Sequence, residues 1–233
     1  MSHPLDNPVW ESLCSRHSGL ARRNGDAARY PPDVAPFAAV SAREADSAQL
    51  AALVDACESI LFVGPSPVLP EATWEADAAV MIAQMVCDAH LPIHVGPAIV
   101  PLSSAAQVAD MLALTALVYP HYFRPRTIGM GRYFGIYDGG RLAAMAGERM
   151  GFDGHQEISA ICTHPDHTGR GYAQRLTATL TNDILDSGRV PFLHVSHQNA
   201  RAKALYERLG FRYRADIALL AVTRLAKRSD AWG

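Results

Sequence analysis

The stretch "EISAICTHPDHTGRGYAQRL", residues 157–176, constrains the fold more than any other part of the sequence. It begins as an apolar run that meets Pro165, a residue that cannot continue the hydrogen bonding of a central strand. Gly169 and Gly171 follow. From Gly171 to Ser187 apolar side chains then recur at helical spacing. The sequence therefore predicts a strand that passes through a glycine-containing turn into an amphipathic helix.

This junction has the features of an anion-binding site. The two glycines permit a tight turn and a close approach of ligand to backbone. The first amides of the helix lack partners within it and lie at the positive end of its dipole. Arg170 can add charge-assisted hydrogen bonds. A Walker A loop is excluded because no Gly-Lys-Ser/Thr follows, and the spacing is too short for a Rossmann fingerprint.

The chain from about residue 97 alternates strands and helices in a mixed α/β pattern. Asp138-Gly139-Gly140 indicates a tight hairpin, since these residues tolerate positive φ angles. Gly210 is expected to end the last helix. The expected elements are a strand at 98–102, a helix at 105–118, a hairpin around 138–140, a strand at 157–163, a helix at 171–187, a strand at 191–196, a helix at 199–209 and two strands within 211–224.

The first part of the chain is predicted to form a smaller α/β unit. Its first thirty or so residues are polar and irregular, and they end in the proline-rich "RYPPDVAPF". A strand at 37–40, a helix beginning near Asp46 and a strand at 59–63 are expected next, whereas 78–87 is ambiguous between strand and helix. We therefore expect an accessory domain at 1–92 and a main domain at 93–233. The accessory domain can be read as a degenerate copy of the main one, although no repeat of residue identity is visible.

Composition excludes several classes of protein. With a net charge of -2, the chain of 233 residues is not expected to bind nucleic acid. Neither a membrane-spanning run nor a signal peptide is present, which predicts a cytoplasmic protein that does not bind membranes. The four cysteines are scattered and form no CxxC pair, which argues against a disulfide framework. No metal site is expected, because the histidines between 155 and 197 lack ligand-like spacing to a carboxylate or cysteine.

Two motifs together resemble the GCN5-related N-acetyltransferases (GNAT superfamily), in particular their FR47-like branch. The family marker Arg/Gln-x-x-Gly-x-Gly/Ala corresponds to Thr168-Gly169-Arg170-Gly171-Tyr172-Ala173. The second marker corresponds to "NARAKALYERLGF", which starts at Asn199. Both stand in the family's order, and the resemblance covers residues 98–224. Thr168 departs from the marker, so one phosphate contact is either lost or made by a hydroxyl.

The resemblance implies a central mixed, mostly antiparallel sheet flanked by helices, and acetyl-CoA as cosubstrate without a metal. The pyrophosphate is expected on the amides of residues 168–173. The pantetheine arm is expected along the strand "ICT", with Asn199 bonding the arm. A bulge in this strand and its separation from the next strand are implied by the family alone. The strand residues expected to contact the cofactor are Ile161, Cys162 and Thr163, and Cys162 is read as a small core residue, not a nucleophile.

Acyl transfer needs a neutral amine, a stabilised oxyanion and a protonated leaving thiolate. Tyr206, in the "ALY" of the second marker, is the predicted acid, with a packing role as the alternative. The resemblance implies Glu157, eleven residues before Thr168, as the base; a solvated carboxylate at a strand end is the alternative. His194 is a rival base, since histidine titrates near neutral pH, and its alternative is a structural histidine. The choice between the two bases stays open.

The resulting functional hypothesis is an N-acyltransferase that moves an acetyl group from acetyl-CoA to a primary amine of a small molecule, amino acid or peptide. Attack is expected to be direct, within a ternary complex. The alternatives are a non-catalytic acyl-CoA-binding or sensing module and a generic nucleotide-phosphate binder. A monomer or homodimer is expected. The resemblance implies an acceptor pocket formed by residues 119–127, Tyr133, 148–150 and 212–217.

Overall fold

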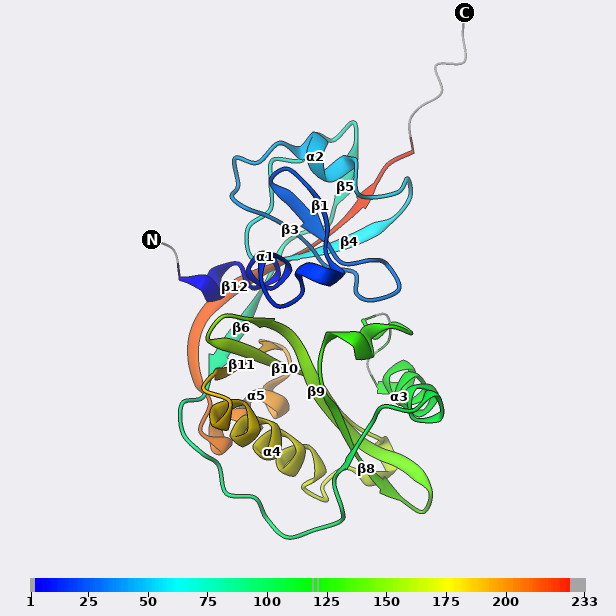
Figure 1. Ribbon diagram of the computed structural model, residues 1–233, viewed down its shortest axis with the longest axis vertical. Helices are drawn as coiled ribbons and strands as arrows, with labels where there is room; N and C mark the ends of the chain where they lie inside the picture. Colours follow the sequence, from blue (N-terminus) through cyan, green and yellow to red (C-terminus); the bar gives the residue numbers. More distant parts are fainter. Residues whose placement is uncertain (1–2, 119, 121, 227–233) are drawn as a thin grey trace, which may run out of the picture. The chain divides into compact units, whose positions relative to one another are not determined.

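The computed structural model describes residues 3–118, 120 and 122–226 (Figure 1). The chain divides into two compact units. The described residues up to 31, those at 36–81 and those from 217 onward form the first unit, and residues 32–35 and 82–216 form the second. This division differs from the expected break after residue 92. Residues 82–86 belong to the second unit because they pair with residues 192–196, and the chain from 217 onward returns to the first unit because residues 219–223 pair with 59–63.

The second unit contains a mixed, mostly antiparallel sheet with the strand order β12-β6-β11-β10-β9-β8-β7. Strands β10 and β11 run parallel, and the pairs β6–β11, β9–β10, β8–β9 and β7–β8 are antiparallel. The expected fold class is therefore confirmed. The strands are β6 (Val80–Val86), β7 (Val100–Pro101), β8 (Tyr133–Asp138), β9 (Arg141–Phe152), β10 (His155–Thr163), β11 (Val190–Ser196) and β12 (Arg212–Arg224).

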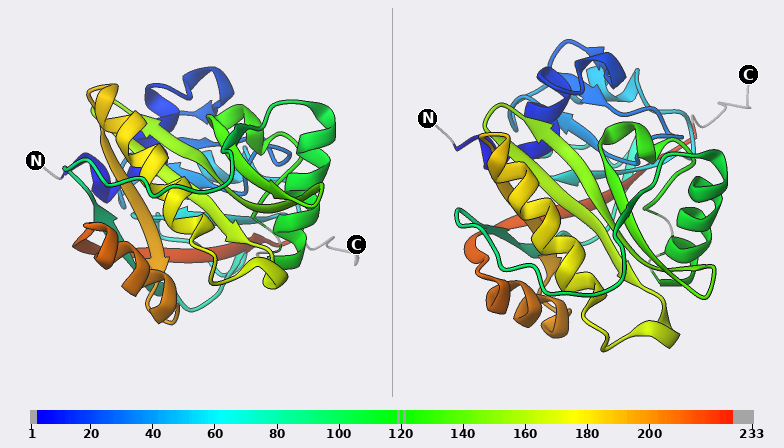
Figure 2. Two further views of the ribbon diagram at one scale, coloured as in Figure 1. Left: turned by 90° about the horizontal axis from the view of Figure 1, so that it is seen from below. Right: turned by 60° about the horizontal axis from the view of Figure 1, so that its bottom comes forward.

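Helices cover both faces of this sheet. Side chains alternate over residues 144–146 of β9, so that Ala144 and Ala146 pack in one apolar cluster with α4 and α5, whereas Met145 packs in another with α3. Helices α3 and α4 therefore lie on opposite faces, as Figure 2 shows on either side of β9. The helices are α3 (Ala105–Val118), α4 (Tyr172–Asp186) and α5 (Ala200–Leu209), with short 3-10 turns at Thr127–Met130 and Pro165–His167.

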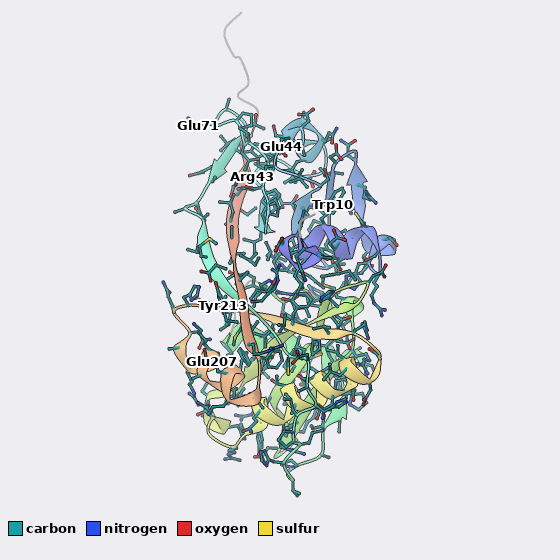
Figure 3. All side chains as sticks on the ribbon, turned by 90° about the vertical axis from the view of Figure 1, so that its left-hand side faces the viewer. Trp10, Arg43, Glu44, Glu71, Glu207 and Tyr213 are labelled. Carbon is teal, nitrogen blue, oxygen red and sulfur yellow. The ribbon has the colours of Figure 1, made fainter. Side chains whose placement is uncertain are left out.

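The first unit has a three-stranded sheet, β1-β2-β3, and a second group in which β4 and β5 both pair with β12. Arg29 lies buried in this unit and forms an ion pair with Glu58. The guanidinium carbon of Arg23 lies 5.1 Å from the ring centroid of Trp10, a residue that is labelled in Figure 3. The elements are α1 (Pro8–Cys14), β1 (Arg22–Asn24), β2 (Ala27–Arg29), β3 (Ala38–Val40), α2 (Ser47–Ala51), β4 (Ser59–Val63), β5 (Trp74–Ala76) and 3-10 turns at Pro4–Asp6 and Ser18–Leu20.

Two expectations about secondary structure were wrong. The first thirty residues are not irregular, because Val9 and Leu13 bury one side of α1 even though that helix is too short to show a periodic pattern. Residues 212–224 form one strand of 13 residues instead of two, since no glycine or proline interrupts them. The ambiguous segment 78–87 contains strand β6.

Other local predictions were confirmed. Helix α3 has the expected bounds, and the hairpin turns at Gly139 and Gly140 with φ of 58° and 78°. Gly210, at φ 105°, ends α5. Within the described part of the chain, no helix is both long enough and apolar enough to cross a bilayer.

Candidate active site

Strands β10 and β11 separate partway along their length. They pair only at His155, Gln156 and Glu157, while β11 remains paired with β6 as far as Ser196. Across the described residues, no pairing between β10 and β11 continues from Ile158 onward. One backbone edge of β10 therefore faces an opening in the sheet, where an extended ligand can form strand-like hydrogen bonds.

The same part of β10 carries a bulge. Its register against β9 shifts between Ser159 and Cys162, and Ala160 adopts the left-handed region at φ 51°. An alanine in this region is strained, and such strain tends to collect at functional sites. The bulge and the strand separation that the resemblance implied are thus both present in the structure.

The opened edge leads toward the glycine turn at the start of α4. Gly169 and Gly171 have φ of 80° and 75°, and an added Cβ at either would meet no atom within 4 Å. Gly171 is the N-cap of α4 and makes no side-chain capping bond. No side chain of the N-cap residue therefore occupies the amides at the start of this 15-residue helix, and the space beside both glycines is open, as a phosphate group requires.

Asp138, in the β8–β9 hairpin, holds the glycine turn by three contacts. Its Oδ2 accepts from Arg170 Nη1 at 2.5 Å and from the Tyr172 hydroxyl at 3.4 Å, and lies 3.3 Å from His167 Nδ1. The Thr168 hydroxyl donates to the Pro165 carbonyl at 3.2 Å. A phosphate would thus share the Arg170 guanidinium with Asp138. It could accept a hydrogen bond from the Thr168 hydroxyl only in place of the Pro165 carbonyl.

A row of five polar residues crosses five neighbouring strands; we call it the cross-strand polar chain. Its members, in sheet order, are Arg214 (β12), Gln84 (β6), His194 (β11), Glu157 (β10) and Arg149 (β9). Arg214 Nη1 donates to Gln84 Oε1 at 2.8 Å, and Gln84 Nε2 lies 3.0 Å from His194 Nε2. His194 Nδ1 lies 2.8 Å from Glu157 Oε1, and Arg149 donates two bonds of 2.6 and 2.7 Å to the same carboxylate.

The hydrogen bonds of the cross-strand polar chain determine which ring nitrogen of His194 carries the hydrogen. Because Arg214 faces the Gln84 oxygen, the Gln84 amide group faces His194 and donates to Nε2. Nδ1 then carries the hydrogen and donates it to Glu157. All bonds along the row are satisfied when His194 is the neutral Nδ1–H tautomer.

Glu157 is fully buried rather than solvated at a strand end. Burial by itself raises its pKa, but the charge and hydrogen bonds of Arg149, together with the bond from His194, outweigh this and lower the pKa to about 2. The Met150 amide adds a bond of 3.3 Å. At neutral pH this carboxylate is ionised and bound on several sides, which makes it a weak proton acceptor.

The cross-strand polar chain lies on the face opposite α4. Leu193 and Val195, which flank His194, pack in the α4 cluster, so His194 points to the other face. Buried Tyr133 is on that face too, because it packs in the α3 cluster. Burial raises the pKa of Tyr133 well above 10, and the charges of Arg149 and Glu157 act on it. Its hydroxyl donates to the Thr127 carbonyl at 3.4 Å.

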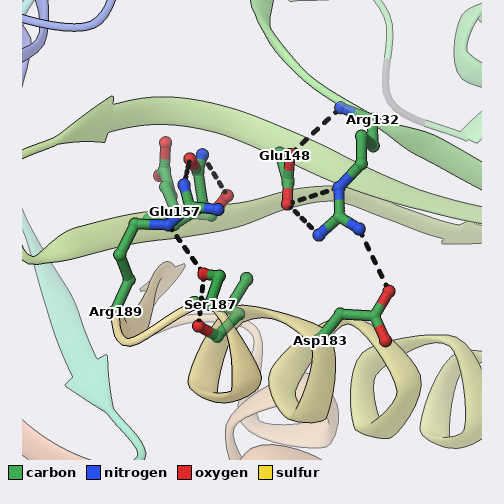
Figure 4. A network of polar contacts seen from close by, with 8 residues as sticks. Arg132, Glu148, Glu157, Asp183, Ser187 and Arg189 are labelled. Atoms are coloured by element: carbon green, nitrogen blue, oxygen red, sulfur yellow. Dashed lines mark hydrogen bonds and ion pairs between the residues drawn. The ribbon is translucent and has the colours of Figure 1, made fainter.

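Glu148 belongs to a different network on the α4 face (Figure 4). Arg132 donates to it from Nε at 3.1 Å and from Nη2 at 2.6 Å, and also binds Asp183 of α4 at 3.2 Å. This network joins the sheet to α4. Glu148, expected in the acceptor pocket, is therefore occupied in a structural contact, and Tyr119 and His121 of the expected acceptor loop lie outside the described residues.

The remaining predicted residues have these positions. Tyr206 is buried on α5, with its ring 6.1 Å from that of Phe211. Asn199 is the N-cap of α5, and its side chain accepts from the Ala202 amide at 3.1 Å. Cys162 is buried in the α3 cluster, and burial raises the pKa of its thiol to about 12, as expected for a core residue.

Sequence reasoning did not identify Gln84, whose only signal was a polar residue in an otherwise apolar strand. Arg149 and Arg214 were expected only as part of the acceptor pocket, and in the structure they complete the cross-strand polar chain. Asp138 was recognised only as a turn residue, and it holds the glycine turn. In the described residues, no group of three or more His, Cys, Asp or Glu is arranged to hold a metal ion.

Comparison with known proteins identifies the family. A crystal structure of a GNAT-family protein from Novosphingobium aromaticivorans DSM 12444 is 36% identical, with a TM-score of 0.88, over 97% of this chain and 100% of that one. The chain belongs to the GNAT family of acetyltransferases. The family model described as FR47-like protein matches residues 133–219 of this GNAT protein.

More distant structures share the fold of this GNAT protein. A GCN5-related N-acetyltransferase from Kribbella flavida is 19% identical with a TM-score of 0.60, over 91% of this chain and 95% of that one. A GCN5-related N-acetyltransferase-like protein from Streptococcus suis 89/1591 is 15% identical with a TM-score of 0.52, over 85% and 84% of the two chains. No curated protein matches the sequence. Membership of the family makes this protein an acyltransferase in its general class.

Proposed function

We propose that this GNAT protein transfers the acetyl group of acetyl-CoA to the primary amine of a small molecule, amino acid or peptide, by direct attack in a ternary complex. One observation carries the proposal. The free edge of β10 beyond Glu157 leads toward the uncapped start of α4 at Gly171. A ligand with an extended amide-containing arm and a pyrophosphate matches these two features, and acetyl-CoA is such a ligand.

The residues that would hold acetyl-CoA divide by the part of the ligand they meet. The backbone of Ile161, Cys162 and Thr163 is on the opened edge and suits the pantetheine amides. The amides of residues 168–173 suit the pyrophosphate, with Arg170 supplying a positive charge. Asn199 keeps its amide nitrogen for the arm, because its Oδ1 already caps α5.

For the base, we propose that Glu157 acts through His194. The lowered pKa and the ion pair with Arg149 disfavour Glu157 itself as the proton acceptor. In the neutral imidazole of His194 the lone pair that can accept a proton lies on Nε2, and in this structure it accepts a hydrogen bond from the Gln84 amide. An amine can therefore give its proton to Nε2 only when the Gln84 amide moves aside, and Glu157 then stabilises the imidazolium that forms. Glu157 is in this view a positioning residue.

Tyr206 is the proposed proton donor to the leaving thiolate, as the family resemblance implies. Tyr206 lies on α5, the helix whose N-cap is Asn199. The same helix would therefore contact the pantetheine arm through Asn199 and the CoA sulfur through Tyr206. The tyrosine hydroxyl, with an ordinary pKa of about 10, is only slightly less acidic than a thiol at about 8.5. Proton transfer from the tyrosine to the thiolate is therefore uphill by only about 2 kcal/mol, which a transient step can accommodate.

Free thiol released from acetyl-CoA in the presence of an amine panel tests the function. Thiol release that depends on the amine, with the acetylated amine found by mass spectrometry, is the expected result. Binding of acetyl-CoA without turnover over the whole panel would favour a sensing module. Calorimetry that finds ATP or NAD binding more tightly than CoA would favour a nucleotide-phosphate binder instead. Action in the cytoplasm, as a monomer or homodimer without nucleic-acid or membrane partners, stays a prediction.

A further inference from the structure

The segment between α3 and β8 contains Arg124, whose buried Nε has no hydrogen-bond partner among the residues that the structure describes. A buried donor without a partner carries a desolvation penalty, and in native proteins such an atom calls for an explanation. An anionic ligand that the protein binds during its reaction would supply one.

Neighbouring arginines are all neutralised within the protein. Arg126, two residues away, binds Asp33 at 3.1 Å. Arg132 binds Glu148 at 2.6 Å and Arg149 binds Glu157 at 2.6 Å. Arg141, at the start of β9, lies 3.4 Å from Asp166. Among the described arginines from 124 to 149, Arg124 alone has no carboxylate partner.

The loop that carries Arg124 packs on the α3 face of the sheet. Its neighbour Phe123 packs against the α3 cluster, as Ala160 of the bulge also does, and meets Tyr133 edge to face with ring centroids 5.5 Å apart. The Arg124 amide donates to Thr127 Oγ1 at 2.7 Å, and this hydroxyl donates to the Val34 carbonyl at 2.6 Å. The backbone of the loop is therefore fixed on the face of the sheet that carries the cross-strand polar chain.

We propose that Arg124 binds a carboxylate of the amine acceptor, so that the acceptor is a small amino acid with both groups. A single unpaired guanidinium balances one negative charge and forms a forked pair with a carboxylate. A phosphate monoester carries nearly two charges and would need a second cation. This proposal rests on the acetyltransferase function and specifies its substrate class.

The test compares common amino acids with their carboxamides as acceptors. Wild-type kcat/KM should be at least about tenfold higher for the acids, which is the discrimination expected for one charge-assisted bond. Arg124→Gln should remove this preference through a higher KM for the acids and leave the KM of acetyl-CoA unchanged. Arg124→Lys should retain part of the preference. Arg126→Gln, two residues away in the same loop, is the matched control and should keep it.

A second readout does not depend on turnover. Thermal unfolding is measured with N-acetyl amino acids and with their carboxamides, in wild type and Arg124→Gln. If the carboxylates stabilise the wild type and not Arg124→Gln, the anion site is supported even when no amine is acetylated. The absence of acetylation would then count against the transferase function only. Equal responses to acids and amides in both assays, or an unchanged preference in Arg124→Gln, would overturn the Arg124 site.

Discussion

His194 Nδ1 lies 2.8 Å from Glu157 Oε1, at the point where strands β10 and β11 part. Glu157 is the last residue of β10 that pairs with β11, and His194 is two residues beyond its partner Phe192. The side-chain bond therefore continues the connection between the strands just where the backbone connection ends. The bond between His194 and Glu157 therefore links the point where the strands separate to the residues that are proposed to accept the proton of the amine.

Replacing Glu157 should change how stability depends on pH. Its folded pKa of about 2 lies below the ordinary value of about 4.3, so its stabilising effect is complete above pH 4.3 and is lost as the pH falls toward 2. Glu157→Gln should lower stability at pH 7 by about 3 kcal/mol, since it removes the carboxylate from a buried ion pair with Arg149. Its Tm should then fall less steeply than that of wild type between pH 5 and 3.

Thermal unfolding at several pH values checks this prediction. Glu207→Gln is the matched control, because Glu207 is exposed on α5 (Figure 3) and should keep the wild-type profile. Parallel profiles for wild type and Glu157→Gln would show that Glu157 does not titrate in the way its ion pair with Arg149 requires.

Replacing Gln84 should change the protonation of His194. In the wild type the imidazole should carry its hydrogen on Nδ1, which ¹⁵N NMR of labelled histidine detects. In Gln84→Glu a carboxylate faces Nε2, so His194 should carry hydrogens on both nitrogens and turnover should fall at neutral pH. An unchanged ¹⁵N spectrum would mean that Gln84 does not orient the tautomer.

Tyr206→Phe tests the proposed acid. Loss of the hydroxyl should lower kcat about 100-fold, within the usual range for acid–base groups, and should leave the affinity for acetyl-CoA nearly unchanged. The measurement is steady-state turnover together with calorimetric titration of acetyl-CoA. Turnover equal to wild type would assign Tyr206 a packing role with Phe211 instead.

Gly171→Asp tests the phosphate site. An aspartate there opposes phosphate charge and strains the positive φ, so the Kd for CoA should rise at least about tenfold. Gly188→Asp is a close control, because Gly188 follows the other end of α4, also has φ 75° and is equally open. A Kd that rises equally in both variants would indicate general damage to α4 rather than loss of the phosphate site.

Gly147→Ala tests how the sheet accommodates Tyr133. An added Cβ would lie 2.1 Å from Tyr133 Cδ1, and the ring is buried and cannot easily move away. The variant should lose about 1 to 3 kcal/mol of stability by overpacking, measured by urea unfolding. Gly129→Ala introduces a Cβ into open space and should have little effect. Equal stability of both variants would show that Tyr133 repacks freely.

Some of the fold could be predicted because its causes are local. Helix α3 follows from apolar spacing, and the hairpin follows from Gly139 and Gly140 at the turn. Helix α1 was missed because it is only seven residues long, and its apolar side chains are buried by parts of the chain distant in sequence. The two strands expected at the end of the chain are one: no glycine or proline interrupts β12, and it pairs with β4, β5 and β6, which are distant in sequence.

The sequence by itself determined the family, the glycine turn at residues 168–173 and the candidate residues Glu157, His194 and Tyr206. Only the tertiary structure decided what surrounds them. His194 is 37 residues from Glu157 and 110 from Gln84, and Gln84 is 130 from Arg214. Strand order and register bring these residues into one row, and no local pattern encodes that row. The charge environment that lowers the pKa of Glu157 is therefore a property of the folded sheet.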